Sequence, residues 1–225
     1  MNAMRPRTAV LLLCLVGLPS VFVLEEAART VAILDRVEHE RDSWQRADEI
    51  IGQLNLRTDQ TVVDLGSGAG YFALKLAPRI LPNGRVLAID LRRQSLAFLW
   101  IRAKLRSDWN IRVIRGSTDD PRLPPGTTVD AVLIANTYHE LTAPDAVLNA
   151  LSASMHHNAR LVVVDRMARS DTGTGSIADR PHEITRAVVE EQLRQHGFET
   201  TAWDDRFIDR PGEEDTWWLL VSRKP

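Results

Sequence analysis

Three glycines follow an acidic residue in the stretch VVDLGSGAGYF, which begins at Val62. Gly66, Gly68 and Gly70 lack side chains, so the backbone can approach a ligand closely there. The helix expected after them offers unpaired N–H groups to a carboxylate. Asp64 places a negative charge just ahead of the turn. We therefore expect a ligand that carries a cationic or hydroxyl-rich portion.

A second carboxylate, Asp90, ends the next apolar run, RVLAID. In open α/β sheets, ligands bind beyond the carboxyl ends of the strands, where the strand order reverses, and a carboxylate there can bind a ribose diol. Dinucleotide enzymes share this carboxylate, but their glycines follow the pattern G-x-G-x-x-G, which suits a pyrophosphate. The pattern here is D-x-G-x-G-x-G. It favours a ribose-bearing ligand with an amino group.

Alternating strands and helices are expected to position these residues. Apolar runs predict strands at 61–65, 85–90, 110–116, 129–136 and 160–165, and helices at 71–77, 94–105 and 143–155 separate them. Continuous apolar strands between helices indicate a parallel sheet covered on both faces. A helix at 183–196 and two strands at 199–208 and 216–222 complete the chain. The predicted fold is a doubly wound, mostly parallel α/β sheet with a C-terminal antiparallel hairpin.

Composition narrows the classes of protein to be considered. A chain of 225 residues with 44% hydrophobic content can bury one substantial core. A net charge of −2 argues against a nucleic-acid partner. The lone Cys14 excludes an intrachain disulfide framework. The adjacent His156 and His157 have diverging side chains, so we expect no metal site.

The N-terminal segment has the pattern of a membrane-directed sequence. Arg5 and Arg7 precede an uncharged run at 8–24, and Glu25 and Glu26 follow it. No small-x-small cleavage site lies behind this run, which favours an uncleaved anchor over a cleaved signal. The expected localisation is membrane-associated or exported, with the side of the membrane left open.

Three parts of the chain are therefore expected. They are an apolar anchor or signal segment at 1–24, a helical cover at 25–58 and the α/β domain at 59–225. In the helical cover, an apolar stripe has the spacing of one helix face. Its residues are Ala47, Ile50, Ile51 and Leu54.

Several motifs of this chain recur together in one known family. The segments DLGSGAG, AID, GSTDDPRLP, DAVLIANTYHEL and RLVVVDR, in this order, resemble the class I methyltransferases that use S-adenosylmethionine. The resemblance covers about residues 45 to 222. The segments ERDSWQRADEII and NTYHEL are similar to a bacterial subgroup of these enzymes. The resemblance implies a Rossmann-like methyltransferase fold, S-adenosylmethionine as cofactor and methyl transfer as the reaction.

The resemblance also implies which residues bind the cofactor. The loop that holds its methionine part is matched by Asp64, Gly66, Ser67, Gly68 and Gly70. Asp90 matches the ribose-binding acid, and Leu91 matches the apolar residue that lines the adenine.

Adenine recognition departs from the family pattern. Many members carry an acidic residue directly after the glycine of the third strand, whereas this chain has Ser117 there. Ser117, Thr118 or Asp119 is therefore expected to contact the adenine. Asn136, at the end of the fourth strand, matches a position close to both the cofactor and the acceptor.

The catalytic candidates are Tyr138 and His139, just beyond the fourth strand, where family members position the nucleophile. An imidazole titrates near neutral pH, so His139 is a candidate general base. Alternatively, both side chains only pack the pocket wall. A nucleophile that is already deprotonated needs no base, because alignment supplies most of the gain.

Two functions remain open on the sequence. One is methyl transfer to a small-molecule or lipid-like acceptor. The other is a cofactor-binding scaffold or assembly module without catalysis. The glycine loop and Asp90 support cofactor binding in both cases.

Overall fold

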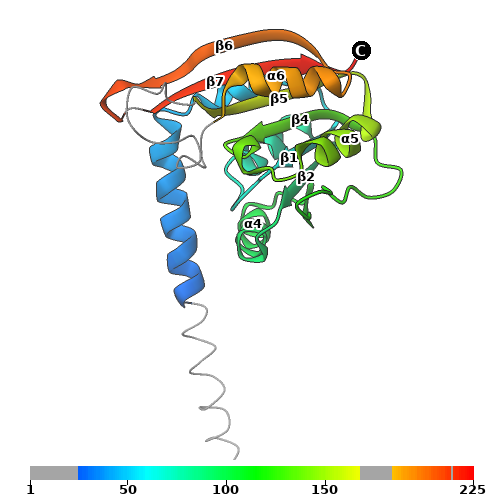
Figure 1. Ribbon diagram of the computed structural model, residues 1–225. Coiled ribbons are helices and arrows are strands. Elements are labelled where there is room, and N and C mark those ends of the chain that lie inside the picture. The colour runs from blue at the N-terminus through cyan, green and yellow to red at the C-terminus, as the bar shows by residue number, and fades with distance from the viewer. Residues whose placement is uncertain (1–24, 168–183, 214) are drawn as a thin grey trace, which may run out of the picture. The chain divides into compact units, whose positions relative to one another are not determined.

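The computed structural model describes residues 25–167, 184–213 and 215–225 (Figure 1). The chain forms two compact units, Met1–Ser43 and Trp44–Pro225. In the first unit, residues 25–42 are helical. The helical cover expected at 25–58 is thus divided, since helix α2 (Ala47–Gln53) belongs to the second unit. The anchor predicted at 1–24 lies outside the described residues, and none of the described helices is long and apolar enough to span a membrane.

The described part of the second unit contains one sheet of seven strands in the order β3-β2-β1-β4-β5-β7-β6. The strands are β1 (Thr61–Leu65), β2 (Arg85–Asp90), β3 (Ile111–Arg115), β4 (Val129–Ala135), β5 (Met155–Arg166), β6 (Glu199–Arg210) and β7 (Asp215–Arg223). Strands β1 to β5 pair in parallel, and β7 runs antiparallel to both of its neighbours. This confirms the doubly wound, mostly parallel sheet. The strand order reverses at β1 and β4, whose carboxyl ends carry the predicted site residues.

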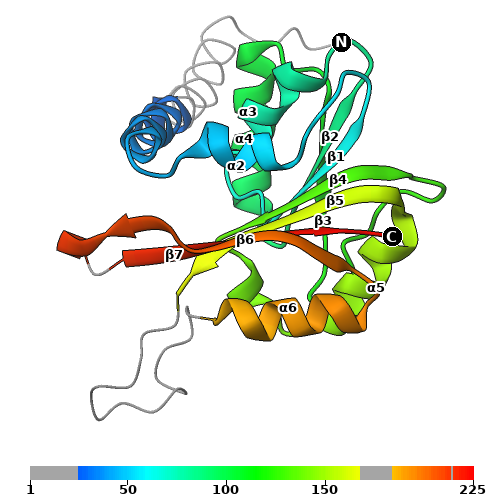
Figure 2. The ribbon, with the colours of Figure 1, turned by 90° about the horizontal axis from the view of Figure 1, so that it is seen from above.

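Helices cover both faces of this sheet (Figure 2). They are α3 (Ala73–Leu76), α4 (Arg93–Arg106), α5 (Pro144–Ser154) and α6 (Arg186–Gln195), with short 3-10 turns at Ala77–Ile80, Tyr138–Glu140 and Pro211–Glu213. Helices α2, α3 and α4 pack on one face, and α5 and α6 pack on the other. Apolar residues of the central strands are buried on both faces, as parallel strands between two helical layers require.

Two elements differ from their predicted form. The helix expected at 71–77 is a single α-turn that continues as a 3-10 turn, where Pro78 cannot donate the next helical hydrogen bond. Strand β5 begins at Met155, before the predicted 160, and its register to β4 shifts between Val129 and Ala131. The predicted hairpin is confirmed at the antiparallel edge of the sheet, where β7 pairs with β5 and β6 is the outermost strand.

Candidate cofactor and catalytic site

The glycine loop is held against the end of β2. The N–H groups of Gly66 and Ser67 both donate to the carbonyl of Ile89, at 2.8 and 3.0 Å. The N–H of Gly70 then donates to the carbonyl of Ser67 at 2.9 Å, which closes the turn before α3. The loop therefore has a defined shape at the carboxyl edge of the sheet.

The glycines serve two different purposes. All three have positive φ: 78° at Gly66, 54° at Gly68 and 104° at Gly70. A Cβ at Gly66 would lie 2.0 Å from Thr137 Oγ1, and one at Gly70 would lie 2.3 Å from Leu99 Cδ1. A Cβ at Gly68 would meet no described atom within 4 Å. Gly66 is thus required by packing and Gly70 by its backbone conformation, whereas Gly68 leaves space for a ligand to approach the backbone.

Asp90 joins this loop to the end of β2. Its Oδ2 accepts from the N–H of Gly68 at 2.9 Å, and its Oδ1 accepts from the N–H of Arg92 at 2.7 Å. Each carboxylate oxygen can accept a further hydrogen bond. Asp90 is half-buried, so it can both shape the loop and accept from a ribose diol. Leu91, the predicted adenine neighbour, is 48% exposed beside it.

Two polar atoms near these elements lack protein partners. Within the described part of the chain, the buried Ser67 Oγ and Asn136 Oδ1 make no hydrogen bond. Asn136 follows β4 with a φ of 52°, and its N–H donates to the carbonyl of Val164 at 2.8 Å. Buried polar atoms without a partner are costly, so a polar ligand would stabilise this arrangement. Together with the space at Gly68 and the carboxylate of Asp90, they fit S-adenosylmethionine. Asp64 is buried at the end of β1, just before the loop.

The turn after β3 lies next to Asp90, whose carbonyl accepts from the N–H of Gly116 at 3.2 Å. Within this turn, Ser117 Oγ donates to Asp119 Oδ1 at 2.8 Å, and the N–H of Ser117 donates to the carbonyl of Asp120 at 2.8 Å. Thr118 is exposed. The structure thus joins Ser117 and Asp119 as one polar unit beside the predicted ribose acid.

Tyr138 is directed away from this polar surface. Its side chain is buried, and its hydroxyl donates to Gln192 Oε1 of α6 at 2.8 Å. Burial raises the pKa of the Tyr138 hydroxyl well above its ordinary value, with the charge of Asp145 adding to the effect. The geometry assigns Tyr138 to packing between the β4 turn and α6.

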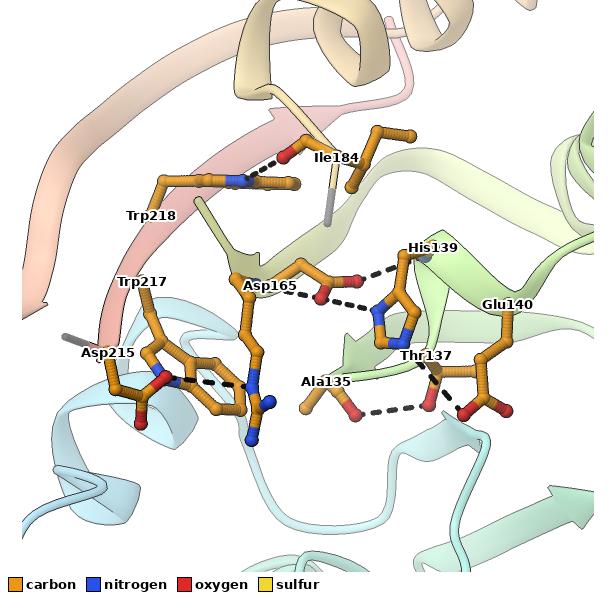
Figure 3. A network of polar contacts seen from close by, with 10 residues as sticks. Ala135, Thr137, His139, Glu140, Asp165, Ile184, Asp215, Trp217 and Trp218 are labelled. Atoms are coloured by element: carbon orange, nitrogen blue, oxygen red, sulfur yellow. Dashed lines mark hydrogen bonds and ion pairs between the residues drawn. The ribbon is translucent and has the colours of Figure 1, made fainter. Parts of the chain in front are cut away.

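His139 forms a buried pair with Asp165, the second-last residue of β5 (Figure 3). Its Nδ1 lies 2.7 Å from Asp165 Oδ1, and its backbone N–H donates to Asp165 Oδ2 at 3.2 Å. The side chains are 3% and 0% exposed, respectively. An ionised carboxylate can only accept, so a neutral imidazole paired with it in this geometry would carry its hydrogen on Nδ1 and its lone pair on Nε2.

The other ring nitrogen faces Glu140. Nε2 of His139 lies 3.8 Å from Glu140 Oε1, and Figure 3 shows the ring between the two carboxylates. Oε2 of Glu140 lies 3.7 Å from a terminal nitrogen of Arg92, two residues after Asp90. Thr137, in the same turn, packs over Gly66. The structure therefore brings the His139 turn and the glycine loop together.

Sequence reasoning missed two residues of this site. Asp165 ends the apolar run RLVVVD just as Asp90 ends RVLAID. An acidic residue at the end of a strand is the sequence feature that indicates Asp165 as a site residue. Arg102 of α4 is 1% exposed, and its guanidinium donates to the carbonyl of Ala69 at 2.7 Å. Nothing in the pattern of α4 distinguishes this arginine from the exposed arginines of the same helix.

We expect Asp90→Ala to weaken the binding of S-adenosylhomocysteine, as measured by calorimetric titration. Each lost hydrogen bond to the carboxylate is worth about 1.5–3 kcal/mol, which is roughly a 10- to 100-fold loss of affinity. Asp130→Ala is the matched control. Asp130 also accepts a backbone N–H, from Thr61 at 2.8 Å, but it lies at the amino ends of the strands, away from the glycine loop. Unchanged affinity in Asp90→Ala would contradict its role as the ribose acid.

Comparisons with known proteins bear on the family and the fold. Residues 62–165 match the family model described as a methyltransferase domain. No match was found among curated proteins. A SAM-dependent methyltransferase from Aquifex aeolicus has a similar structure, with a TM-score of 0.70 and 20% identity, over 87% of this chain and 98% of that one.

Two further solved structures are similar in fold. The [4+2]-cyclase SpnF has a TM-score of 0.68 at 19% identity, over 80% of this chain and 81% of that one. The YcgJ protein from Bacillus subtilis has a TM-score of 0.60 at 12% identity, over 79% and 94%. The open space at Gly68 lies within the range that matches the family model. Residues 62–165 therefore form the core of a class I methyltransferase domain, and its cofactor is S-adenosylmethionine.

Proposed function

We propose that the enzyme methylates a small-molecule or lipid-like acceptor whose attacking atom carries a proton, and that His139 removes this proton. The pair of His139 and Asp165 supports the proposal. A desolvated, charge-assisted hydrogen bond holds the imidazole in one orientation and one tautomer. Orientation of this kind is what a general base requires.

One group of residues would bind the cofactor, and another would remove the proton of the acceptor. When bound, S-adenosylmethionine supplies an electrophilic methyl group on a sulfonium. The glycine loop, Ser67, Asp90 and Asn136 would hold it. Nε2 of His139 accepts the proton of the acceptor, and the buried carboxylate of Asp165 stabilises the imidazolium that results.

Glu140 controls access to Nε2. Its side chain is 47% exposed, and its Oε1 lies 3.8 Å from Nε2 of the buried imidazole. We infer that the acceptor displaces this side chain on binding. Its carboxylate lies 3.8 Å from Nε2, so a proton would pass between them only after the side chain moves closer or through a bridging water.

Transfer of a labelled methyl group tests the proposal. The wild-type protein is incubated with S-adenosylmethionine labelled at the methyl group and with separate polar and lipid fractions of a cell extract. We expect label to enter one fraction, which also shows whether the acceptor is lipid-like. Binding of S-adenosylhomocysteine without label transfer in any fraction would favour the scaffold or assembly module.

We further propose that residues 1–24 tether the enzyme to a membrane. The support is the order of two arginines, an uncharged run and two acidic residues. The core of the Trp44–Pro225 unit is built from residues of that unit. Deleting residues 1–24 should therefore release a soluble, monodisperse protein that still binds S-adenosylhomocysteine, whereas the full-length chain sediments with membranes. Aggregation or loss of binding in the truncated chain would show that the segment belongs to the fold.

A further inference from the structure

Arg166 is the sequence neighbour of Asp165, the carboxylate that pairs with His139. It is the last residue of β5, directly after Asp165. Its backbone N–H donates to Asp165 Oδ1 at 2.8 Å, and the same oxygen accepts from His139. One carboxylate oxygen thus joins the backbone of Arg166 to the imidazole. The side chain of Arg166 is 46% exposed, so a ligand at this edge of the sheet can reach it.

The guanidinium of Arg166 is positioned by an aromatic ring. Its Cζ lies 5.3 Å from the centroid of Trp217, a buried indole of β7. The nearest described carboxylate, Asp215, lies 3.6 Å from Nε, beyond hydrogen-bond distance. Oδ1 of Asp215 accepts instead from Trp217 Nε1 at 2.8 Å, and Oδ2 accepts from Arg210 at 3.1 Å. Among the described residues, the guanidinium of Arg166 therefore makes no side-chain hydrogen bond.

Arg210 completes the cluster on its other side. Its Cζ lies 4.3 Å from the ring centroid of Trp44, which precedes α2. The rings of Trp44 and Trp217 are 5.9 Å apart and tilted by 54°. Two guanidiniums thus flank a pair of indoles and share the carboxylate of Asp215. Residues from four places in the chain hold this cluster at the end of β5 where the catalytic pair lies.

We propose that Arg166 binds a carboxylate or phosphate group of the methyl acceptor, while Arg210 binds the carboxylate of Asp215 and holds it beyond hydrogen-bond distance of Arg166. A guanidinium stacked on an indole keeps its N–H donors at its edge, where they match both oxygens of a planar or tetrahedral anion. The anion would lie at the carboxyl end of β5, one residue beyond the carboxylate that pairs with His139. Holding the acceptor at this point would orient its nucleophile toward the imidazole, which is how remote binding groups accelerate transfer.

Small aromatic anions test this inference. It rests on the proposed function in one respect, namely that the bound anion belongs to the methyl acceptor. Phenyl phosphate, benzoate and the neutral benzamide are titrated calorimetrically into the full-length protein in non-ionic detergent with S-adenosylhomocysteine present. We expect an anion to bind at least tenfold more tightly than benzamide, and the two anions to show whether phosphate or carboxylate is preferred. Arg166→Gln should weaken anion binding at least tenfold and leave the affinity for S-adenosylhomocysteine unchanged.

Arg223→Gln is the matched control. Arg223 is 44% exposed, is paired with Glu199 at 2.9 Å and lies at the opposite end of β7 from Trp217. This variant should bind the anions as the wild type does. If Arg166→Gln does not fold, Arg166→Met retains contact with Trp217 while removing the charge and replaces it in the experiment.

Each result bears on one proposal. Equal binding of benzamide and the anions, or undiminished anion binding in the Arg166 variant, would overturn the inference. Anion binding that depends on Arg166 supports it, even if no fraction of the extract is methylated. Absence of methylation in every fraction would contradict the proposed function and leave the inference about Arg166 intact. Conversely, methyl transfer that proceeds equally well in Arg166→Gln would sustain the proposed function and overturn the inference.

Discussion

Replacement of His139 by glutamine should lower the rate of methyl transfer by a factor of about 100 to 10,000, the usual contribution of a positioned general base. The affinity for S-adenosylhomocysteine should stay unchanged, because the glycine loop and Asp90 are left intact. Single-turnover measurements with the acceptor found in the extract give the rate, and calorimetry gives the affinity. The expected loss is large because glutamine cannot take up the proton at Nε2.

Two further variants show whether the loss is chemical. Asp165→Asn replaces the acceptor-only carboxylate by an amide that can present N–H to Nδ1, so the tautomer is no longer imposed and the rate should also fall. Tyr138→Phe removes only the hydroxyl that donates to Gln192. It should cost about 1 kcal/mol of stability and leave the rate intact. A His139→Gln protein with a lower melting temperature and full activity would show that the histidine only packs.

Gly66→Ala should be among the most destabilising substitutions in the glycine loop. With φ at 78°, alanine would adopt a left-handed conformation, which costs about 1–2 kcal/mol. The new Cβ would also lie 2.0 Å from Thr137 Oγ1 and 2.6 Å from Thr137 Cβ, and overpacking of this kind costs about 1–3 kcal/mol. The sum of roughly 2–5 kcal/mol is a large part of the total stability of a domain. Denaturant unfolding measures it.

Gly68→Ala separates packing from ligand binding. It has the same backbone requirement, with φ at 54°, but its Cβ would meet no described atom within 4 Å. We expect a loss of only about 1–2 kcal/mol in stability. Its affinity for S-adenosylhomocysteine should fall, because the methyl group enters the space that a ligand would occupy. Equal stability losses in the two variants would show that contact with Thr137 does not determine the role of Gly66.

Much of the cofactor half of this enzyme follows from local sequence patterns. Strands β1 and β2 have the predicted bounds, 61–65 and 85–90, because continuous apolar runs between turn residues have few alternative structures. The predicted glycine loop has positive φ at all three glycines. The glycine loop follows β1 directly, and Asp90 ends the adjacent parallel strand β2. Sequence patterns of a few residues are therefore enough to place both of them.

The proposed catalytic pair depends on contacts that no local pattern contains. His139 and Asp165 meet only because β4 and β5 pair in parallel and end at the same edge. Tyr138, the neighbour of His139, is directed into the core by the position of α6. The indole of Trp217 lies next to Arg166 because β7 pairs with β5, whereas the sequence predicted a hairpin at the sheet edge without showing which of its strands joins β5.

The sequence by itself therefore determined the individual parallel strands, the glycine loop and the carboxylate at the end of β2, because each depends on residue type and short spacing. Only the tertiary structure decided which strand each C-terminal strand joins, and hence which carboxylate orients His139 and which ring positions Arg166. The physical reason is that alternation along a strand specifies which face a side chain occupies, whereas the order of strands is set by the packing of the whole sheet.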